Sequence, residues 1–254
     1  MINTYSESSL HKTLKDIYAL KDGCRTEVKR DGKIYDIVDK EDNVIEIQTK
    51  NVSKLLKKTM AVLENGKKIK IVLPVIIEKH IELYEKDGTR ISRRKSPVKG
   101  SIYDIFDELT GLYPVLLDKN FSLDVLEITM TELRIHTPEP VQSQNGRRRF
   151  RKNWNKTDKT LNEILKTHTF SSSENYLKLI PRQCFPEFSA KELSAALKTN
   201  KSLPASAASR AHIMIWVLNK MNLIKLKEIK NRSRCYCVMS TLNDMARINQ
   251  NNPK

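Results

Sequence analysis

The sequence predicts an α/β protein in two parts, an N-terminal domain built on a mixed sheet and a mostly α-helical C-terminal domain. Three observations predict this. Apolar strand patterns alternate with amphipathic helix patterns in the first half, the composition changes sharply in the middle, and helix patterns dominate the last third. A chain of 254 residues has room for two such domains. We expect them at residues 1–137 and 158–243, joined by a basic linker, 138–157, and followed by a polar tail, 244–254.

The first domain is expected to follow the order helix, three strands, helix, strand. Leu10, Leu14 and Ile17 recur at helical spacing and predict a first helix over residues 6–20. A turn at Asp31-Gly32 separates the first two of the three strands. The expected elements that follow are strands 26–30, 34–38 and 44–49, helix 52–64, strand 68–75, and less regular patterns for strands 81–84 and 123–132 and helix 103–109.

The last third predicts three helices and a β-hairpin. Helix patterns occur at 160–166, 188–198 and 203–224, and "KLKEIKNRSRCYCVMS" predicts strand, basic turn, strand. This is the layout of a winged helix-turn-helix, a fold that places its second helix in the major groove of DNA. We expect residues 206–212 to face the groove, with Arg210 as the base-reading candidate.

The positive charge is concentrated in three segments. The formal net charge is +16, and residues 88–100, 147–156 and 225–234 carry +5, +6 and +4 of it. Such clusters favour a polyanionic partner, most simply nucleic acid, with an anionic membrane surface second and a solvated basic surface as the plain alternative. The candidate nucleic-acid-binding residues are Arg93, Arg94, Lys95, Arg147, Arg148, Arg149, Arg151, Arg210, Lys230, Arg232 and Arg234.

Other sequence features narrow the class. No apolar stretch approaches the roughly 18 to 20 residues that span a bilayer, and the first residues lack the layout of a signal peptide. The four cysteines show neither a CxxC pair nor zinc-ligand spacing, which is typical of free thiols in a cytoplasmic protein. We therefore expect a cytoplasmic protein without a membrane partner, and the sequence leaves a homodimer open.

Two acids stand in the middle of apolar strands. Asp36 lies in "KIYDIVDK" and Glu46 in "NVIEIQTKN". Acidic side chains are rarely buried unless they are paired or bind a metal. Mg²⁺ prefers one or two carboxylates, with water and phosphate oxygens completing its shell, so a cation between these acids would offset the cost of burial. The alternative is that either acid lies at a strand edge and faces water.

Asp36, followed after nine residues by Glu46-Ile47-Gln48, resembles the signature of the PD-(D/E)XK nucleases, whose restriction-endonuclease-like core has the same order of elements. The resemblance covers residues 5–76. It implies that Asp36, Glu46 and the carbonyl of Ile47 bind Mg²⁺, with Mn²⁺ as a substitute. It also implies that Gln48, where most members have Lys, positions the attacking water. The runs "IEIQTKN", "IVLPV" and "ISRRKSP" also resemble an uncharacterised bacterial domain family.

Four further residues are candidates for the same site. Many members of the nuclease family add an acid from the first helix, and Glu7 matches by place. Glu27 on the first strand competes with it, His11 lies one turn after Glu7, and Lys50 could return the positive charge that Gln48 lacks. The expected function is a Mg²⁺-dependent endonuclease that cleaves double-stranded DNA. A catalytically inactive DNA-binding protein of the same fold and an RNA-binding or RNA-cleaving protein are the alternatives.

Overall fold

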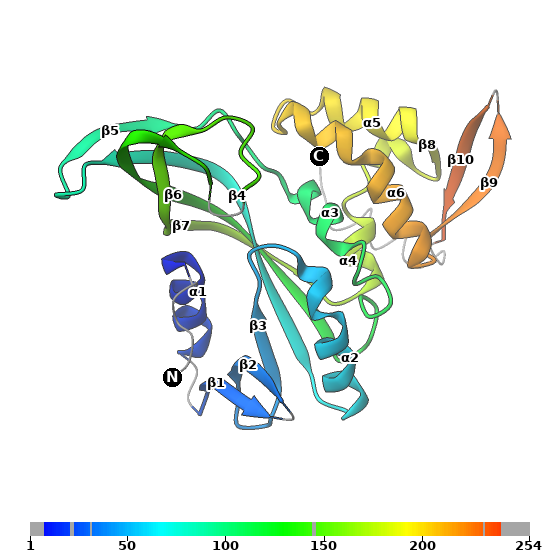
Figure 1. Ribbon diagram of the computed structural model, residues 1–254. Helices are drawn as coiled ribbons and strands as arrows, with labels where there is room; N and C mark the ends of the chain where they lie inside the picture. The colour runs from blue at the N-terminus through cyan, green and yellow to red at the C-terminus, as the bar shows by residue number, and fades with distance from the viewer. Residues whose placement is uncertain (1–7, 21–22, 31, 144–145, 231, 240–254) are drawn as a thin grey trace.

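A seven-stranded mixed sheet organises the first two thirds of the chain, and a smaller helical part follows it (Figure 1). The structure is a computed structural model and describes residues 8–20, 23–30, 32–143, 146–230 and 232–239. The large sheet has the strand order β1-β2-β3-β4-β6-β7, and β5 pairs with β4. The predicted α/β architecture with a mixed sheet is therefore confirmed.

The predicted order of the first six elements is also confirmed. Helix α1 spans Ser9–Ala19 and is followed by β1 (Arg25–Arg30), β2 (Lys33–Val38) and β3 (Val44–Ile47). These three strands pair in antiparallel fashion. A 3-10 turn, η2 (Val52–Leu55), leads into α2 (Leu56–Glu64), and β4 (Ile69–Tyr84) then returns parallel to β3.

Two strands are longer than the sequence pattern predicts, and a third is not predicted as a strand. Strand β4 has 16 residues, β6 (Phe121–Val141) has 21 and β7 (Lys152–Phe170) has 19. Strand β5 (Arg90–Lys95) forms a hairpin with the end of β4, and the short helices η3 (Ile102–Asp104) and α3 (Ile105–Leu109) lie between β5 and β6. In Figure 1, the far ends of β4, β6 and β7 curve into a lobe together with β5.

The predicted basic linker is wrong. Residues 138–157 contain the end of β6, a connection and the start of β7, and the two strands pair over most of their length. The predicted helix over 160–166 is wrong for the same reason, since it lies within β7. Long-range pairing with β6 decides the conformation of this stretch, and a local pattern cannot reveal such pairing. The first part of the chain accordingly extends to about residue 170.

Different helices cover the two faces of the sheet. On one face, Leu10 and Leu14 of α1 pack on Ile37, Ile47 and the middle of β6. On the other face, buried side chains of η2, α2 and α3 pack on the same strands. This second core continues without a break into the C-terminal part, so the two parts share one hydrophobic core. Burial of apolar side chains in that core holds them together.

The C-terminal part combines three helices with a small antiparallel sheet. Its elements are α4 (Ser173–Leu177), η4 (Arg182–Cys184), β8 (Glu187–Ser189), α5 (Ala190–Thr199), η5 (Ala205–Arg210), α6 (Ala211–Lys220), β9 (Ile224–Lys230) and β10 (Ser233–Val238). The sheet has the order β8-β10-β9. The side chain of Ser189 accepts a hydrogen bond from the backbone of Glu192 and caps α5. The predicted tail, 244–254, lies outside the described residues.

Within the described ranges, no helix combines the length and the apolar character that crossing a bilayer requires. The four cysteines, which all lie in these ranges, are free thiols.

Candidate active site

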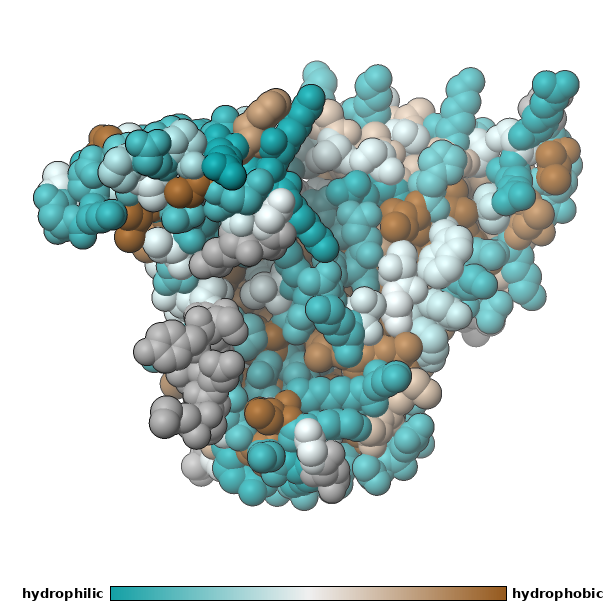
Figure 2. Space-filling model, in the orientation of Figure 1, coloured by the Kyte–Doolittle hydropathy of each residue, from teal (hydrophilic) through white to brown (hydrophobic). Residues whose placement is uncertain are grey.

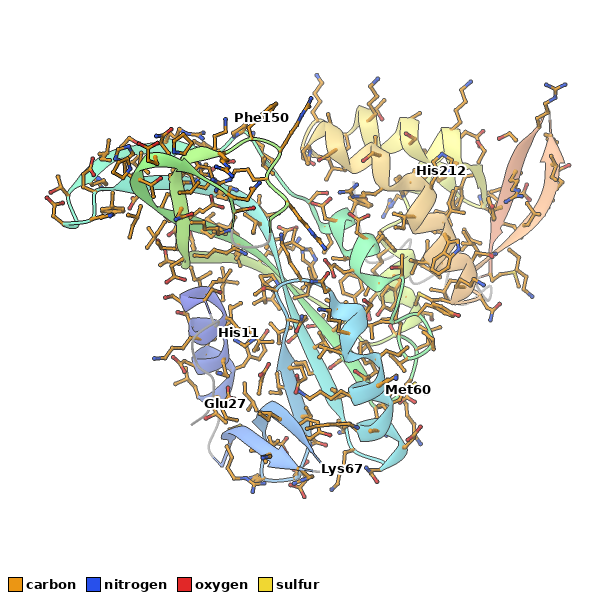
Figure 3. All side chains as sticks on the ribbon, in the orientation of Figure 1. His11, Glu27, Met60, Lys67, Phe150 and His212 are labelled. Atoms are coloured by element: carbon orange, nitrogen blue, oxygen red, sulfur yellow. The ribbon has the colours of Figure 1, made fainter. Side chains whose placement is uncertain are left out.

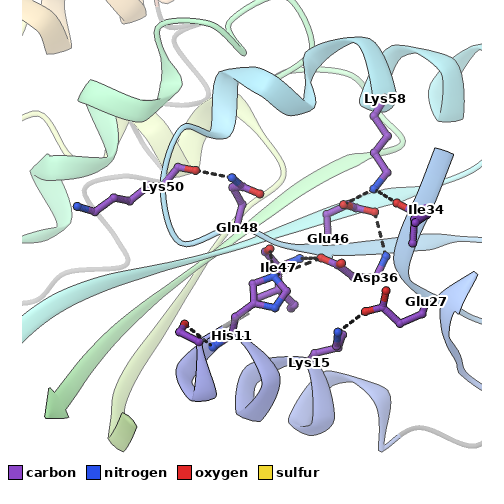
Figure 4. A network of polar contacts seen from close by, with 11 residues as sticks. His11, Lys15, Glu27, Ile34, Asp36, Glu46, Ile47, Gln48, Lys50 and Lys58 are labelled. Carbon is purple, nitrogen blue, oxygen red and sulfur yellow. Dashed lines mark hydrogen bonds and ion pairs between the residues drawn. The ribbon is translucent and has the colours of Figure 1, made fainter. Parts of the chain in front are cut away.

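Asp36 and Glu46 meet at the point where β2 and β3 stop pairing through their backbones. The ladder contains the pairs Val38 to Val44 and Ile37 to Ile45, and the next step along each strand brings Asp36 opposite Glu46. Here side chains replace the ladder. The backbone N–H of Ile47 donates to Oδ2 of Asp36 at 2.8 Å, and the backbone N–H of Asp36 lies 3.3 Å from Oε1 of Glu46. Figure 4 shows both carboxylates in this gap.

Glu46 is buried and has a cationic partner on α2. The residue is 3% exposed, and its Oε2 lies 2.6 Å from Nζ of Lys58, which also donates to the carbonyl of Ile34. Burial raises the pKa of Glu46 to about 7, the charge of Lys58 opposes that rise, and the charge of Asp36 adds to it. The two acids are therefore electrostatically coupled.

His11 on α1 lies against Asp36 and Ile47. Its Nε2 is 2.7 Å from the carbonyl oxygen of Ile47 and 3.7 Å from Oδ2 of Asp36. Figure 3 shows that the side chain of His11 projects from α1 toward the sheet. The imidazole thus contacts one of the predicted metal-binding groups and lies close to a second.

The other candidate residues occupy distinct positions. The register of β1 and β2 places Glu27 opposite Asp36, but its carboxylate forms an ion pair with Lys15 of α1. The backbone of Glu27 has a φ of 53°, a strained conformation for this residue type and one that is enriched at functional sites. The side-chain amide of Gln48 donates to the backbone carbonyl of Lys50. Glu7 lies outside the described residues.

The donor set suits a cation that keeps most of its water. Among the described residues, no group of three or more His, Cys, Asp or Glu side chains is arranged to hold a metal. The predicted ligands are two carboxylates and a carbonyl, which is the number that Mg²⁺ typically takes from a protein. Such a cation would also favour the ionised form of Glu46, which burial disfavours.

Apart from Arg210, the basic residues predicted to bind nucleic acid lie on three hairpins. Arg93, Arg94 and Lys95 are exposed on β5, although Arg93 lies 3.1 Å from Glu82 and Lys95 pairs with Glu78. The chain between β6 and β7 exposes Arg147, Arg149 and Arg151. Figure 2 shows hydrophilic side chains covering the lobe formed by β5 and the ends of β6 and β7.

Aromatic side chains accompany this charge. The guanidinium of Arg148 lies 4.1 Å from the ring centre of Trp154 and also donates to the carbonyl of Val141. Phe150 is exposed at the edge of the lobe. On the C-terminal hairpin, Arg232 and Arg234 are exposed. Lys230, also exposed there, pairs with Glu228 at 2.7 Å.

Arg210 is engaged within the protein. It lies 3.2 Å from Asp104 of η3 and 2.9 Å from Asp107 of α3. Trp216 of α6 meets Tyr113, which follows α3, edge to face at 5.7 Å. The start and one side of α6 therefore face the first part of the chain. This arrangement conflicts with Arg210 as a free base-reading side chain, because two carboxylates already hold it.

The structure adds Lys58 to the site. Sequence reasoning named Lys50 as the substitute cation, yet it is Lys58 that reaches Glu46. Lys58 lies on the predicted amphipathic helix 52–64, twelve residues after Glu46. The sequence shows only that Lys58 is a polar residue on this helix. Its contact with Glu46 follows from the packing of α2 on β2 and β3, which the sequence pattern does not predict.

Comparison with protein families identifies the family to which this chain belongs. A family model described as a domain of unknown function (DUF8091) matches residues 8–171, more than half of the chain. The chain belongs to the DUF8091 family. It is also similar to an uncharacterized protein of Treponema pallidum (strain Nichols), with 31% identity over 151 residues. That alignment covers 59% of this chain and 57% of the relative, so the chain matches less than two thirds of the relative's length. No solved structure matches.

The DUF8091 region coincides with the first structural part. It runs from the start of α1 to the end of β7 and contains the whole seven-stranded sheet. Asp36, Glu46, Ile47 and His11 all lie within it. The helical part with α4 to β10 follows the matched region.

Proposed function

We propose that this protein is a Mg²⁺-dependent DNA endonuclease whose catalytic carboxylates are Asp36 and Glu46. The observation that carries the proposal is the meeting of these two acids where β2 and β3 diverge, beside the backbone of Ile47. The burial of Glu46 and the repulsion between the two acids favour a divalent cation as partner. The topology supports the same conclusion. Antiparallel β1-β2-β3, then α2, then β4 parallel to β3 is the order expected of a restriction-endonuclease-like core.

Each residue has a distinct role in this proposal. Asp36, Glu46 and the carbonyl of Ile47 hold the cation, which when bound polarises a phosphodiester and acidifies water. Lys58 favours the ionised form of Glu46, because its charge lowers the pKa of Glu46 against the effect of burial. Gln48 orients water through its amide, and Lys50 lies two residues beyond it. His11 donates to the carbonyl of Ile47 in the metal-free protein, with Nε2 carrying the proton.

The C-terminal part is proposed to hold duplex DNA as a winged helix. Helix α4, strand β8, helices α5 and α6, and the β9–β10 hairpin occur in the order of that fold, with β10 between β8 and β9. Because α6 faces the first part of the chain, the exposed basic hairpin at Arg232 and Arg234 is the surface available to the phosphate backbone.

A DNA-binding protein without turnover is the second candidate. Two observations favour it. The amide of Gln48 is occupied by the carbonyl of Lys50, and the described residues offer only two carboxylates to a cation. Cleavage decides between the two candidates, since both predict binding.

The test is nicking of a supercoiled plasmid by the full-length protein with and without Mg²⁺ or Mn²⁺. Asp36→Asn and Glu46→Gln are expected to abolish nicking while leaving affinity for a labelled duplex unchanged or higher, because each acid repels phosphate when no metal is bound. Asp16→Asn and Glu64→Gln are matched controls at exposed acids on α1 and α2. Binding without metal-dependent nicking would favour the second candidate. A parallel assay with duplex RNA of the same sequence decides the type of nucleic acid.

A further inference from the structure

A cluster of cations surrounds one buried carboxylate on the face of the sheet that α1 covers. Glu132 on β6 is 6% exposed. Its carboxylate lies 2.5 Å from a guanidinium nitrogen of Arg134, 3.1 Å from Nζ of Lys156 and 3.4 Å from Nζ of Lys79. These side chains come from β4, β6 and β7, so three neighbouring strands build the cluster.

Lys159 adds a further cation at the same place. The register of β6 and β7 puts Lys159 directly opposite Glu132. Burial, together with the charges of Lys156, Lys50 and Lys79, lowers the pKa of Lys159 to about 8, against the opposing effect of Glu132. Like charges are therefore crowded here beyond what one carboxylate neutralises. An added anion would relieve that repulsion.

The cluster lies on the face of the sheet where His11 of α1 meets Asp36, whereas Lys58 of α2 reaches Glu46 from the other face. Alternate residues of β6 share a face, and Ile128 and Met130, which precede Glu132 on that face, pack against α1. The start of α1 is tied to β7 next to the cluster, because the backbone N–H of Ser9 donates to Asp158 at 2.9 Å. His11 follows Ser9 by two residues on α1, and its Nε2 lies 3.7 Å from Oδ2 of Asp36 on β2.

Two further contacts link the cluster to its surroundings. Lys50, which contributes to the crowding at Lys159, follows Gln48 by two residues and so connects the cluster to β3. In the other direction, the guanidinium of Arg134 lies 3.5 Å from the ring centre of Trp154. The guanidinium of Arg148, in the basic β6–β7 connection, also contacts that ring. Positive charge thus runs from the candidate site to the exposed lobe.

We propose that this cluster is a phosphate-binding site that holds the DNA backbone beside the candidate active site. Its members are Lys79, Arg134, Lys156 and Lys159. Phosphodiester oxygens accept hydrogen bonds, carry negative charge and offer no proton, which matches a site with excess donors and excess positive charge. Glu132 positions Arg134, Lys156 and Lys79 through its contacts. This inference rests on the nucleic-acid substrate of the proposed function and does not require cleavage.

The experiment measures binding of a fluorescein-labelled 24-base-pair duplex to the full-length protein in EDTA, by anisotropy across a salt series. The double variant Lys79→Gln and Lys159→Gln is expected to bind on the order of tenfold more weakly at low salt. Its slope of log K against log salt should be shallower by about 1.8, from about 0.9 per lost phosphate contact. The matched control is Lys68→Gln with Lys119→Gln. These two exposed lysines lie just before the starts of β4 and β6, at the ends of these strands away from the cluster. It should change the affinity by less than about twofold, since it leaves the cluster intact.

A second measurement on the unaltered protein guards against a folding defect in the variant. Amine-selective modification followed by mass spectrometry should label Lys159 in the free protein, and bound duplex should protect it, while Lys119 stays equally reactive. Inorganic phosphate at the same phosphate concentration serves as the competing probe. Equal protection by phosphate alone would show a site for a free anion and would overturn the proposal.

The possible failures are distinguishable. Unchanged affinity and slope in the double variant, with the unaltered protein still binding DNA, would overturn this phosphate site and leave the proposed function standing. A slope near zero for the unaltered protein would overturn both, because no phosphate contact would then contribute to binding.

Discussion

The ammonium group of Lys58 lies 2.6 Å from Oε2 of Glu46, and the two side chains are 16% and 4% exposed. A pair this poorly hydrated contributes little net stability, but removing one partner leaves the other charge uncompensated. At pH 8 we expect Lys58→Met to lower the free energy of unfolding by about 2 kcal/mol, because Glu46 is then largely ionised in the native protein.

The double variant Lys58→Met with Glu46→Gln should recover most of that loss, since neither charge remains. Urea unfolding of the four proteins gives the coupling energy, which we expect to exceed about 1 kcal/mol. Additive effects of the two substitutions would show that the contact does not couple the residues. Lys57→Met, at the exposed neighbouring position, is the control for loss of a lysine from α2.

The contact of His11 with Ile47 predicts the effect of a second variant. Nε2 of His11 lies 2.7 Å from the carbonyl that the proposed cation requires, so the imidazole and the cation compete for it. We expect His11→Ala to bind Mn²⁺ about three- to tenfold more tightly, corresponding to the roughly 1 kcal/mol of one hydrogen bond. Calorimetric titration of the unaltered and variant proteins measures this. Weaker binding in the variant would instead identify His11 as a ligand and contradict the competition.

The elements that the sequence predicts well are those whose pattern is local. Helix α1, strands β1 to β3 and helix α2 each carry their own apolar periodicity, and the structure reproduces their order. The outer halves of β4, β6 and β7 carry little such signal, because one face is polar and basic. Pro138 and Pro140 followed by an Arg-rich run predict a linker, whereas pairing between β6 and β7 makes them a strand end and a connection. Pairing between strands that are distant in the sequence cannot be predicted from the local pattern of a single sequence.

The same distinction applies to the candidate site. Asp36 and Glu46 could be predicted to be neighbours because they lie on adjacent strands joined by a short turn. Lys58 could not, since its contact depends on how α2 packs. The cluster around Glu132 joins residues from position 79 to position 159, and no spacing in the sequence brings Lys79, Lys156 and Lys159 together. Long strands in parallel and antiparallel register create that cluster.

The ion pairs of Arg210 predict a third outcome. Its guanidinium is held by Asp104 and Asp107, and both partners are partly exposed, so the pairs are worth at most about 1 kcal/mol. If Arg210 reads a base as the sequence suggests, Asp107→Asn should favour its release and tighten duplex binding by about two- to fivefold, within that range. Anisotropy with several duplexes measures the change, and Asp118→Asn in the loop before β6 is the control. Equal affinity of Asp107→Asn and the unaltered protein would leave Arg210 as a contact between the two parts of the chain.

The lowered pKa of Lys159 predicts that its replacement stabilises the free protein. In the unfolded chain this lysine releases its proton near pH 10.5, but in the folded protein it does so near pH 8 because of burial and the surrounding cations. Below about pH 8 both states are protonated, and the folded state bears the full cost of the crowded charge. Between about pH 8 and 10.5 the unfolded state holds more protons, so the stability of the unaltered protein rises with pH as that cost disappears. Lys159→Gln should therefore be more stable at pH 7 by about 1 kcal/mol, a value reduced from the full shift because Lys159 is partly exposed. The advantage should be lost by about pH 10.5.

Urea unfolding at pH 7 and pH 10 measures the difference in stability between Lys159→Gln and the unaltered protein, with Lys119→Gln as the control that should show none. A variant that is less stable at pH 7 would mean that Glu132 more than compensates the crowding. A variant that gains stability while losing affinity for duplex DNA would show that the charge of Lys159 destabilises the free protein and contributes to DNA binding.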